Sequence, residues 1–132
     1  MNVEILQRLG LVVLGSALGG GLRYLAQVGF IELLGPAFPF GTLFVNVAGS
    51  FLIGLIMHVG LGSELISPET RIFLTSGVMG GMTTYSTFNY ETLGFLREGA
   101  LLLAGVNLVA TVILCLAAGL LGLAVGRAWV GG

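Results

Sequence analysis

The sequence predicts an all-α integral membrane protein of four transmembrane helices. Of its 132 residues, 56% are hydrophobic and only 8% are charged, whereas a soluble domain carries about a quarter charged residues. The few charges separate long uncharged stretches, and they are too few to cover a soluble fold of this size. We therefore expect a single transmembrane domain over residues 1–132.

The uncharged stretches give the approximate helix boundaries. They are Leu9–Leu22, Leu33–Ser63, Ile72–Tyr90 and Gly99–Gly126. A bilayer core about 30 Å thick needs roughly 20 helical residues, so three stretches are long enough alone, and the first is long enough if it continues past Arg23. Pro36 and Pro39 mark a loop, whereas Ser67 before Pro68 marks a helix start. The helices are expected at about residues 8–30, 41–60, 69–97 and 100–127.

Several functional classes receive no support from the composition. Cys115 is the one cysteine, so a disulfide within one chain and a cysteine-based metal site are both excluded. The five basic residues form no basic tract, so nucleic-acid binding has no electrostatic basis. His58 is the one histidine and falls near a helix end, which leaves no Ser/His/acid or Cys/His catalytic set. We do not expect an enzyme.

The arginines give almost no bias to the membrane orientation. Arg8, Arg71 and Arg127 fall on one side of the four expected spans, and Arg23 and Arg97 fall toward the other. Orientation normally follows an excess of Lys and Arg on the cytoplasmic side. We expect insertion in both orientations and antiparallel pairing of two copies; a single, weakly biased orientation is the alternative.

Glycine is abundant, with 23 residues. Membrane helices associate by close packing through small residues, and Gly15 with Gly19, and Gly122 with Gly126, have the spacing for such contacts. Each motif alone is also compatible with ordinary membrane-helix composition. Because four thin helices are few for enclosing a permeation path, we expect an oligomer within the lipid bilayer.

The third expected helix carries a polar segment at membrane depth. Seven of the ten residues from Thr83 to Thr92 are polar, directly after a glycine-rich stretch. Such a segment is tolerated in a membrane only inside protein or against water, and glycine weakens the helix. We expect a break near Gly80–Thr84; a continuous helix with back-bonded Ser and Thr is the alternative. Freed carbonyls would suit a hard cation and freed amides an anion, and the residues alone leave that choice open.

Other spans contribute isolated polar residues. Asn46 is the one amide in the second span, with Ser50 one turn later, and Asn107 and Thr111 are four apart in the fourth. An amide group offers two donors that could replace the water around an anion, although contact between helices is the simpler role for the residue taken alone.

Two aromatic and two charged residues complete the candidates. Tyr85 and Phe88 share a helix face, where ring edges could face an anion or simply pack. Arg23 could draw anions toward a vestibule or anchor the first helix. Glu91 is expected to pair with an arginine or to orient the broken helix.

Three segments together resemble the Fluc (CrcB) family of fluoride channels. They are Gly20-Gly21-Leu22-Arg23-Tyr24, Gly41-Thr42-Leu43-x-Val45-Asn46-x-x-Gly49-Ser50 and Gly80-Gly81-Met82-Thr83-Thr84-Tyr85-Ser86-Thr87-Phe88. The third segment is the most specific, and the resemblance covers essentially the whole chain. It implies passive export of fluoride across the cytoplasmic membrane by an antiparallel homodimer with two pores.

The resemblance also implies roles for single residues. Backbone carbonyls of Gly80 and Thr83 from each subunit would hold a structural sodium ion that is not transported. Asn46 would be the pore asparagine, and Tyr85 and Phe88 would be the pore-facing aromatic pair. Thr84, Thr87, Asn107 and Thr111 would form a polar track. Tyr85 departs from the family pattern, in which phenylalanine is more frequent at this position.

Two other functions compete with a channel. A small proton-coupled multidrug exporter would also have four helices, but it would be expected to carry an acidic residue deep in its first helix, and the sequence has none between Arg8 and Glu32. A non-transporting assembly partner would explain the glycines but not the polar segment of the third span.

Overall fold

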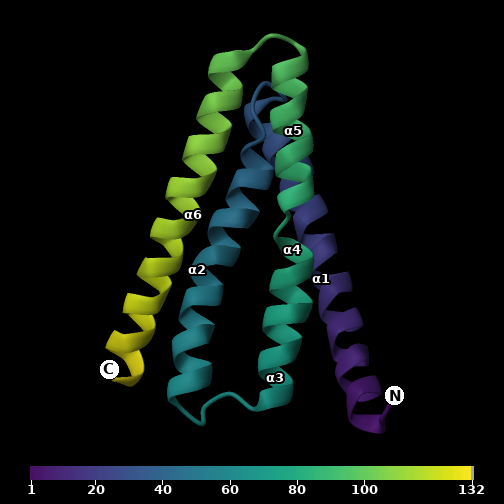
Figure 1. The fold of residues 1–132 in the computed structure, drawn as a ribbon, viewed down its shortest axis with the longest axis vertical. Helices are drawn as coiled ribbons and strands as arrows, with labels where there is room; N and C mark the ends of the chain where they lie inside the picture. The colour runs from purple at the N-terminus through teal and green to yellow at the C-terminus, as the bar shows by residue number, and fades with distance from the viewer. Residues whose placement is uncertain (132) are drawn as a thin grey trace.

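A computed structural model describes residues 1–131 as an all-helical chain without strands in that range. Its elements are α1 (Val3–Leu34), α2 (Phe40–Gly62), α3 (Pro68–Ile72), the π-helix η1 (Phe73–Met79), α4 (Gly80–Met82), α5 (Tyr85–Arg97) and α6 (Leu101–Val130). Figure 1 shows α1, α2 and α6 as three long rods, while α3, η1, α4 and α5 follow one another along the bundle. Both termini lie at the same end, beside the connection between α2 and α3.

The long helices identify a multi-pass membrane protein. α1, α2 and α6 are each long and apolar enough to cross a bilayer. Most of α1 and almost all of α6 remain unburied within the chain, so their apolar side chains need lipid or another protein surface around them. The segments from Pro68 to Arg97 together form the third traverse of the bundle, between α2 and α6 (Figure 1).

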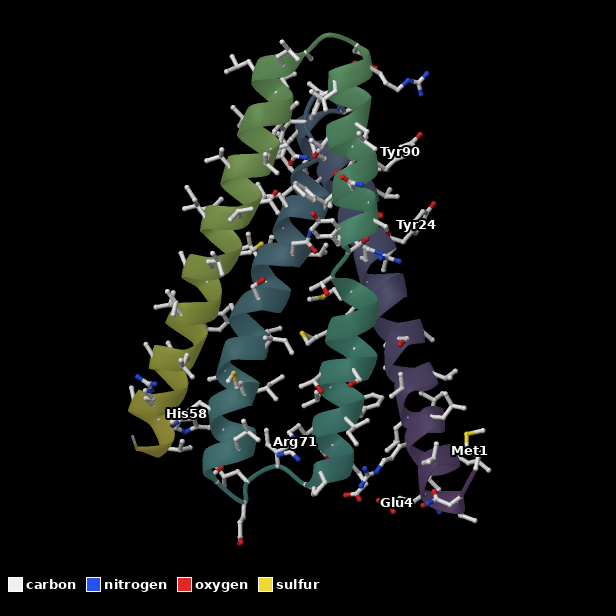
Figure 2. All side chains as sticks on the ribbon, in the orientation of Figure 1. Met1, Glu4, Tyr24, His58, Arg71 and Tyr90 are labelled. Atoms are coloured by element: carbon white, nitrogen blue, oxygen red, sulfur yellow. The ribbon has the colours of Figure 1, made fainter. Side chains whose placement is uncertain are left out.

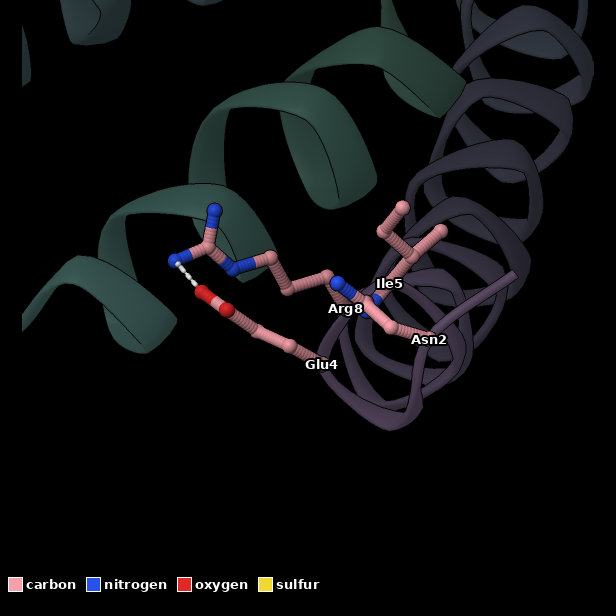
Figure 3. Close-up of polar contacts among 4 residues, drawn as sticks. All are labelled: Asn2, Glu4, Ile5 and Arg8. Atoms are coloured by element: carbon pink, nitrogen blue, oxygen red, sulfur yellow. Dashed lines mark hydrogen bonds and ion pairs between the residues drawn. The ribbon is translucent and has the colours of Figure 1, made fainter.

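The first helix begins five residues earlier than the sequence predicted. The side chain of Asn2 accepts a hydrogen bond from the Ile5 amide (2.9 Å) and caps α1, and Glu4 pairs with Arg8 one turn later at 2.5 Å. Figure 3 shows the Glu4–Arg8 pair, with Asn2 and Ile5 beside it at the start of α1. The expected start was wrong because it followed the hydrophobic stretch, whereas capping and ion pairing extend a helix into polar sequence.

The remaining ends lie closer to the expected positions. α2 is longer than predicted by one residue at its start and two at its end, and α6 begins one residue later and ends three later. The predicted cap at Ser67 is confirmed, because its hydroxyl accepts from the Thr70 amide (3.1 Å), with Pro68 in the first turn. The C-terminal end of α2 is covered by Arg71, whose guanidinium donates to the Gly60 carbonyl (3.0 Å).

The third traverse is interrupted, as predicted, and the continuous-helix alternative is wrong. Thr83 (φ −81°, ψ 152°) and Thr84 (φ −152°, ψ 120°) are extended, and they separate α4 from α5. The sequence did not predict the π-helix η1 just before this break. π-helical turns are rare in general and are frequent at functional sites.

Both glycine motifs make contacts within one chain. Gly15 and Gly19 of α1 lie against the backbone of η1 and α4, and Gly122 and Gly126 of α6 lie against α2. A Cβ built on Gly15 would lie 2.6 Å from the Phe73 carbonyl oxygen, so glycine is needed for this approach. The first motif packs the broken segment against α1, and the second packs α6 against α2, in agreement with packing through small residues.

Replacing Gly19 by alanine is expected to destabilise the fold. The added methyl group would collide with the backbone carbonyl of Val78 and would lie 2.8 Å from the Met82 nitrogen, and such overpacking costs about 1–3 kcal/mol. The thermal midpoint of purified Gly19→Ala protein in detergent should fall. Gly10→Ala is the control, because a Cβ there meets nothing within 4 Å; equal midpoints for the two variants would contradict the packing role.

Candidate functional site

Asn46 of α2 bridges the break in the third traverse. Its Nδ2 donates to the Thr84 carbonyl (3.1 Å), and its Oδ1 accepts from the Thr84 amide (2.8 Å). Both residues are buried. One asparagine side chain thus satisfies both peptide groups of an extended residue that a helix would otherwise pair internally. The second amide hydrogen of Asn46 remains available to another acceptor.

The break diverts the donors that would otherwise pair with two carbonyl groups. In a continuous helix the Thr84 amide would bond the Gly80 carbonyl and the Thr87 amide would bond the Thr83 carbonyl. Instead, the Thr84 amide donates to Asn46 and the Thr87 amide donates to the Thr84 hydroxyl (3.1 Å). The carbonyls of Gly80 and Thr83 therefore lack their normal helical donors. Carbonyl oxygens of this kind are ligands for hard cations.

Hydroxyl groups continue along the start of α5. The Thr84 hydroxyl caps this helix and donates to the Thr87 hydroxyl (3.1 Å). Within residues 1–131, the Thr87 hydroxyl hydrogen has no recorded acceptor. The amide dipoles at the start of a helix also favour negative charge nearby. This region therefore offers donors to an anion.

A cavity of about 480 Å³ lies beside the break. Its lining combines donors and apolar groups: Asn46, Gly49, Ser50, Ile53, Thr83, Thr84, Tyr85, Phe88, Thr111, Val112, Cys115 and Leu116. The structure thus brings together residues from the second, third and fourth spans that the sequence singled out separately. A mostly apolar cavity with a few polar groups is typical of a small-ligand site.

The two aromatic residues of α5 contact each other and differ in exposure. Their ring centroids are 5.6 Å apart in an edge-to-face arrangement. Phe88 is 5% exposed, whereas Tyr85 is 78% exposed. Both rings line the cavity of about 480 Å³, with Tyr85 extending out from the protein. A second surface is needed to enclose that side of the cavity.

The two polar residues of α6 have different surroundings. Asn107 is 1% exposed and donates to the Thr92 hydroxyl (3.0 Å), which ties α6 to α5. Thr111 lines the cavity of about 480 Å³, and its hydroxyl is buried without a partner within residues 1–131. An unpartnered hydroxyl in a cavity wall is a candidate group for binding a polar ligand.

Glu91 does not pair with an arginine within residues 1–131. Its Oε1 instead accepts from the Thr42 hydroxyl (2.6 Å), which accepts from the Gln27 amide (3.1 Å). These three residues and Thr87 line a second cavity of about 710 Å³ near the turn between α1 and α2. Tyr24 and Tyr90, which line the same cavity, extend toward one side of the molecule in Figure 2.

Arg23 lies away from both cavities. It is half-buried on α1, and neither cavity includes it in its lining. Its role in attracting anions or anchoring the helix stays a prediction. His58 likewise keeps its expected place at a helix end, where its ring lies 3.1 Å from the Gly131 carbonyl oxygen (Figure 2).

Sequence reasoning missed the contacts among helices. It identified Asn46 and Thr84 but not their reciprocal hydrogen bonds, and it attached no role to Gln27 or Thr42 beyond the motif containing the latter. Gln27 is a polar residue in an apolar span, which was a signal that could have been followed.

Among residues 1–131, no group of three or more His, Cys, Asp or Glu is placed to hold a metal ion.

Comparison with known proteins gives a consistent result. The profile of the family described as "CrcB-like protein, Camphor Resistance (CrcB)" matches residues 10–123. A protein of Anaeromyxobacter dehalogenans named "Fluoride-specific ion channel FluC" is 56% identical over 111 residues, which cover 84% of this chain and 88% of the relative. A protein of the same name from Geotalea daltonii is 48% identical over 112 residues, covering 85% and 90% of the two chains. The matched residues 10–123 include the helix break, Asn46 and all residues that line the two cavities. Because the family profile and these relatives match most of the chain, the chain belongs to the CrcB family.

Proposed function

We propose that this protein is a fluoride-specific ion channel that lets fluoride leave the cell passively across the cytoplasmic membrane. The observation that carries the proposal is the cavity beside the helix break, where Asn46, Thr84 and Thr111 supply polar groups among apolar ones. The names of the close relatives point to the same anion.

The chemistry of the cavity suits a small, strongly hydrated anion. Entry into a membrane protein removes water from the ion, and protein donors must replace that water. The free amide hydrogen of Asn46, hydroxyl hydrogens and the positive edges of the Tyr85 and Phe88 rings are suitable replacements. A narrow path lined in this way favours fluoride over the larger chloride.

The conducting form in this proposal is an antiparallel homodimer. Tyr85 is largely exposed although it lines the cavity, and a second copy would enclose that side. The nearly equal distribution of arginines between the two ends supports insertion in both orientations. Each of two pores would then be lined by both subunits.

A structural sodium ion is part of the same proposal. The carbonyls of Gly80 and Thr83 lack their helical donors because the Thr84 and Thr87 amides bond elsewhere, and carbonyl oxygens fit sodium. Bound there, the ion would supply positive charge that stabilises the broken backbone. It would not be transported.

The main competing function, a proton-coupled multidrug exporter, has less support. Such a carrier would use a deep acidic residue in its first helix, and α1 has no acidic residue between Glu4 and Glu32. Glu91 lies on α5 and is hydrogen-bonded to Thr42, so it is a poor substitute for an acidic residue in α1.

The function is tested in liposomes that contain the purified protein. Vesicles loaded with fluoride should release it rapidly without a proton gradient, and chloride-loaded vesicles should not. Release that requires a proton gradient would favour the exporter, and no release would favour an assembly partner.

The sodium proposal predicts that the purified protein still contains sodium after desalting, measured by atomic emission. Protein that is free of sodium and still conducts fluoride would contradict the proposal.

The proposed dual topology predicts that the C-terminus lies in the cytoplasm in about half of the molecules and outside it in the others. A reporter fused after Gly132 should give comparable signals in the cytoplasm and outside it. The control is a variant with two lysines inserted after Arg8, which should bias the reporter toward one side. A reporter found on one side only in the unmodified protein would contradict dual insertion.

Replacing Asn46 by aspartate is expected to abolish most of the fluoride flux. An ionised aspartate cannot donate to the Thr84 carbonyl, and its negative charge repels the anion. Flux should fall about tenfold to hundredfold, since unsatisfied buried polar groups cost about 1–3 kcal/mol and each 1.4 kcal/mol is about tenfold. Asn89→Asp is the matched control, because Asn89 is exposed on α5 and lines neither cavity. Unchanged flux in Asn46→Asp would remove Asn46 from the path.

Replacing Tyr85 by phenylalanine is expected to preserve fluoride-selective flux. The edge-to-face contact with Phe88 depends on the ring and not on the phenol group. The ratio of fluoride to chloride release from liposomes measures the outcome. Complete loss of conduction would instead show that the hydroxyl group is required.

A further inference from the structure

A hydrogen-bond chain crosses three helices at the end of the bundle where α1 turns into α2. Gln27 of α1 donates to the Thr42 hydroxyl (3.1 Å), and this hydroxyl donates to Glu91 Oε1 of α5 (2.6 Å). Gly41 makes the chain possible: a Cβ there would lie 2.6 Å from the Gln27 Cα, so only glycine lets α2 approach α1 this closely. Thr42 is 3% exposed, so water does not compete for its hydroxyl.

The chain can run in one direction only. The Nε2 group of Gln27, which faces Thr42, carries hydrogens and cannot accept, so the Thr42 oxygen must act as its acceptor. The one hydroxyl hydrogen of Thr42 is then left for Glu91. Gln27 therefore determines that Thr42 donates to the carboxylate. A residue at position 27 that accepted instead would take this hydrogen away from Glu91.

Glu91 lies next to a group that the proposed path needs. Thr84, Thr87 and Glu91 follow one face of α5. Thr84 lines the cavity of about 480 Å³, Thr87 lines the cavity of about 710 Å³, and their hydroxyls are hydrogen-bonded at 3.1 Å. This pair therefore links the two cavities. On the proposed path, the free hydroxyl hydrogen of Thr87 would be the donor that an anion meets between them.

A carboxylate one turn away is a direct competitor for that hydrogen. Hydrogen bonds to ionised acceptors are about twice as strong as neutral ones. The Glu91 Oε2 atom is buried without a partner within residues 1–131, and no arginine in that range pairs with this carboxylate. Thr42 is the one side-chain donor recorded for it among those residues.

We propose that Gln27 is a positioning residue for anion conduction. By directing the Thr42 hydroxyl to Glu91, it holds the carboxylate against α2 and away from Thr87, so that the Thr87 hydroxyl stays free for the permeating anion. This proposal rests on the proposed fluoride conduction and adds to it a residue of the first helix that lies outside the break and outside the cavity of about 480 Å³.

The test compares two substitutions of Gln27 in liposome flux assays. Gln27→Glu is nearly isosteric but accepts the Thr42 hydrogen, and Gln27→Met keeps the length and removes the donor. Fluoride flux should fall about tenfold in Gln27→Glu, because a hydrogen bond to a charged group is at stake, and by less in Gln27→Met. Gln7→Met is the matched control, since Gln7 is exposed on the same helix and makes no recorded side-chain hydrogen bond within residues 1–131.

A second substitution distinguishes positioning from packing. If Gln27 acts through the carboxylate, Gln27→Glu combined with Glu91→Gln should recover most of the lost flux, because the neutral amide competes weakly for Thr87. Glu91→Gln alone should keep or raise the flux, because it removes the competing carboxylate. Should Gln27→Glu fail to fold, Thr42→Val, measured with and without Glu91→Gln, tests the same effect at the middle residue of the hydrogen-bond chain.

The outcomes separate this proposal from the proposed function. Absence of fluoride flux in the unmodified protein would end the channel assignment itself. With that flux present, normal flux in Gln27→Glu, no recovery in the double variant, or loss of flux in Glu91→Gln alone would each overturn the positioning role.

Discussion

The structure depends on one exchange of hydrogen bonds, between the side-chain amide of Asn46 and the backbone of Thr84. A peptide group left unpaired within a bilayer costs several kcal/mol, and an extended residue in the third traverse exposes both its N–H and its C=O. Asparagine is suited to this position because one side chain carries a donor and an acceptor in the same plane. Without this bridge, the break would have to close into a helix or fill with water.

The consequences of the exchange extend in two directions from Thr84. Toward the N-terminus, the Gly80 carbonyl loses its usual donor, and toward the C-terminus, the Thr84 hydroxyl is free to cap α5 and to bond Thr87. Carbonyl oxygens and hydroxyl donors thus lie within a few residues of each other, with opposite electrostatic preferences. The glycine contacts of α1 with η1 and α4 keep this short segment in place.

The sequence was sufficient for the helix number, the approximate spans and the position of the break, because these follow from local composition and from glycine next to a hydroxyl-rich stretch. It was insufficient for the start of α1, where the Asn2 cap and the Glu4–Arg8 pair extend the helix beyond the apolar residues. It also gave no sign of η1, which contacts Gly15 and Gly19 of a helix far away in the sequence. The Gln27–Thr42–Glu91 chain was missed for a similar reason, because it joins residues 15 and 49 positions apart. Asn46 and Thr111 were identified as polar residues in apolar spans, but their neighbours could only be known from the fold.

The separation of Asn46 from Thr84 has a consequence for biosynthesis. The two residues are 38 positions apart, so the ribosome delivers α2 to the membrane well before its partner exists. A single amide does not prevent a span as apolar as α2 from inserting into lipid before the third traverse is synthesised. The segment around Thr84 has no such independence, because its open peptide groups have no place in hydrocarbon. The second helix can therefore be in the membrane first and supply the hydrogen bonds that the third traverse needs when it inserts. The order of synthesis matches this order of insertion.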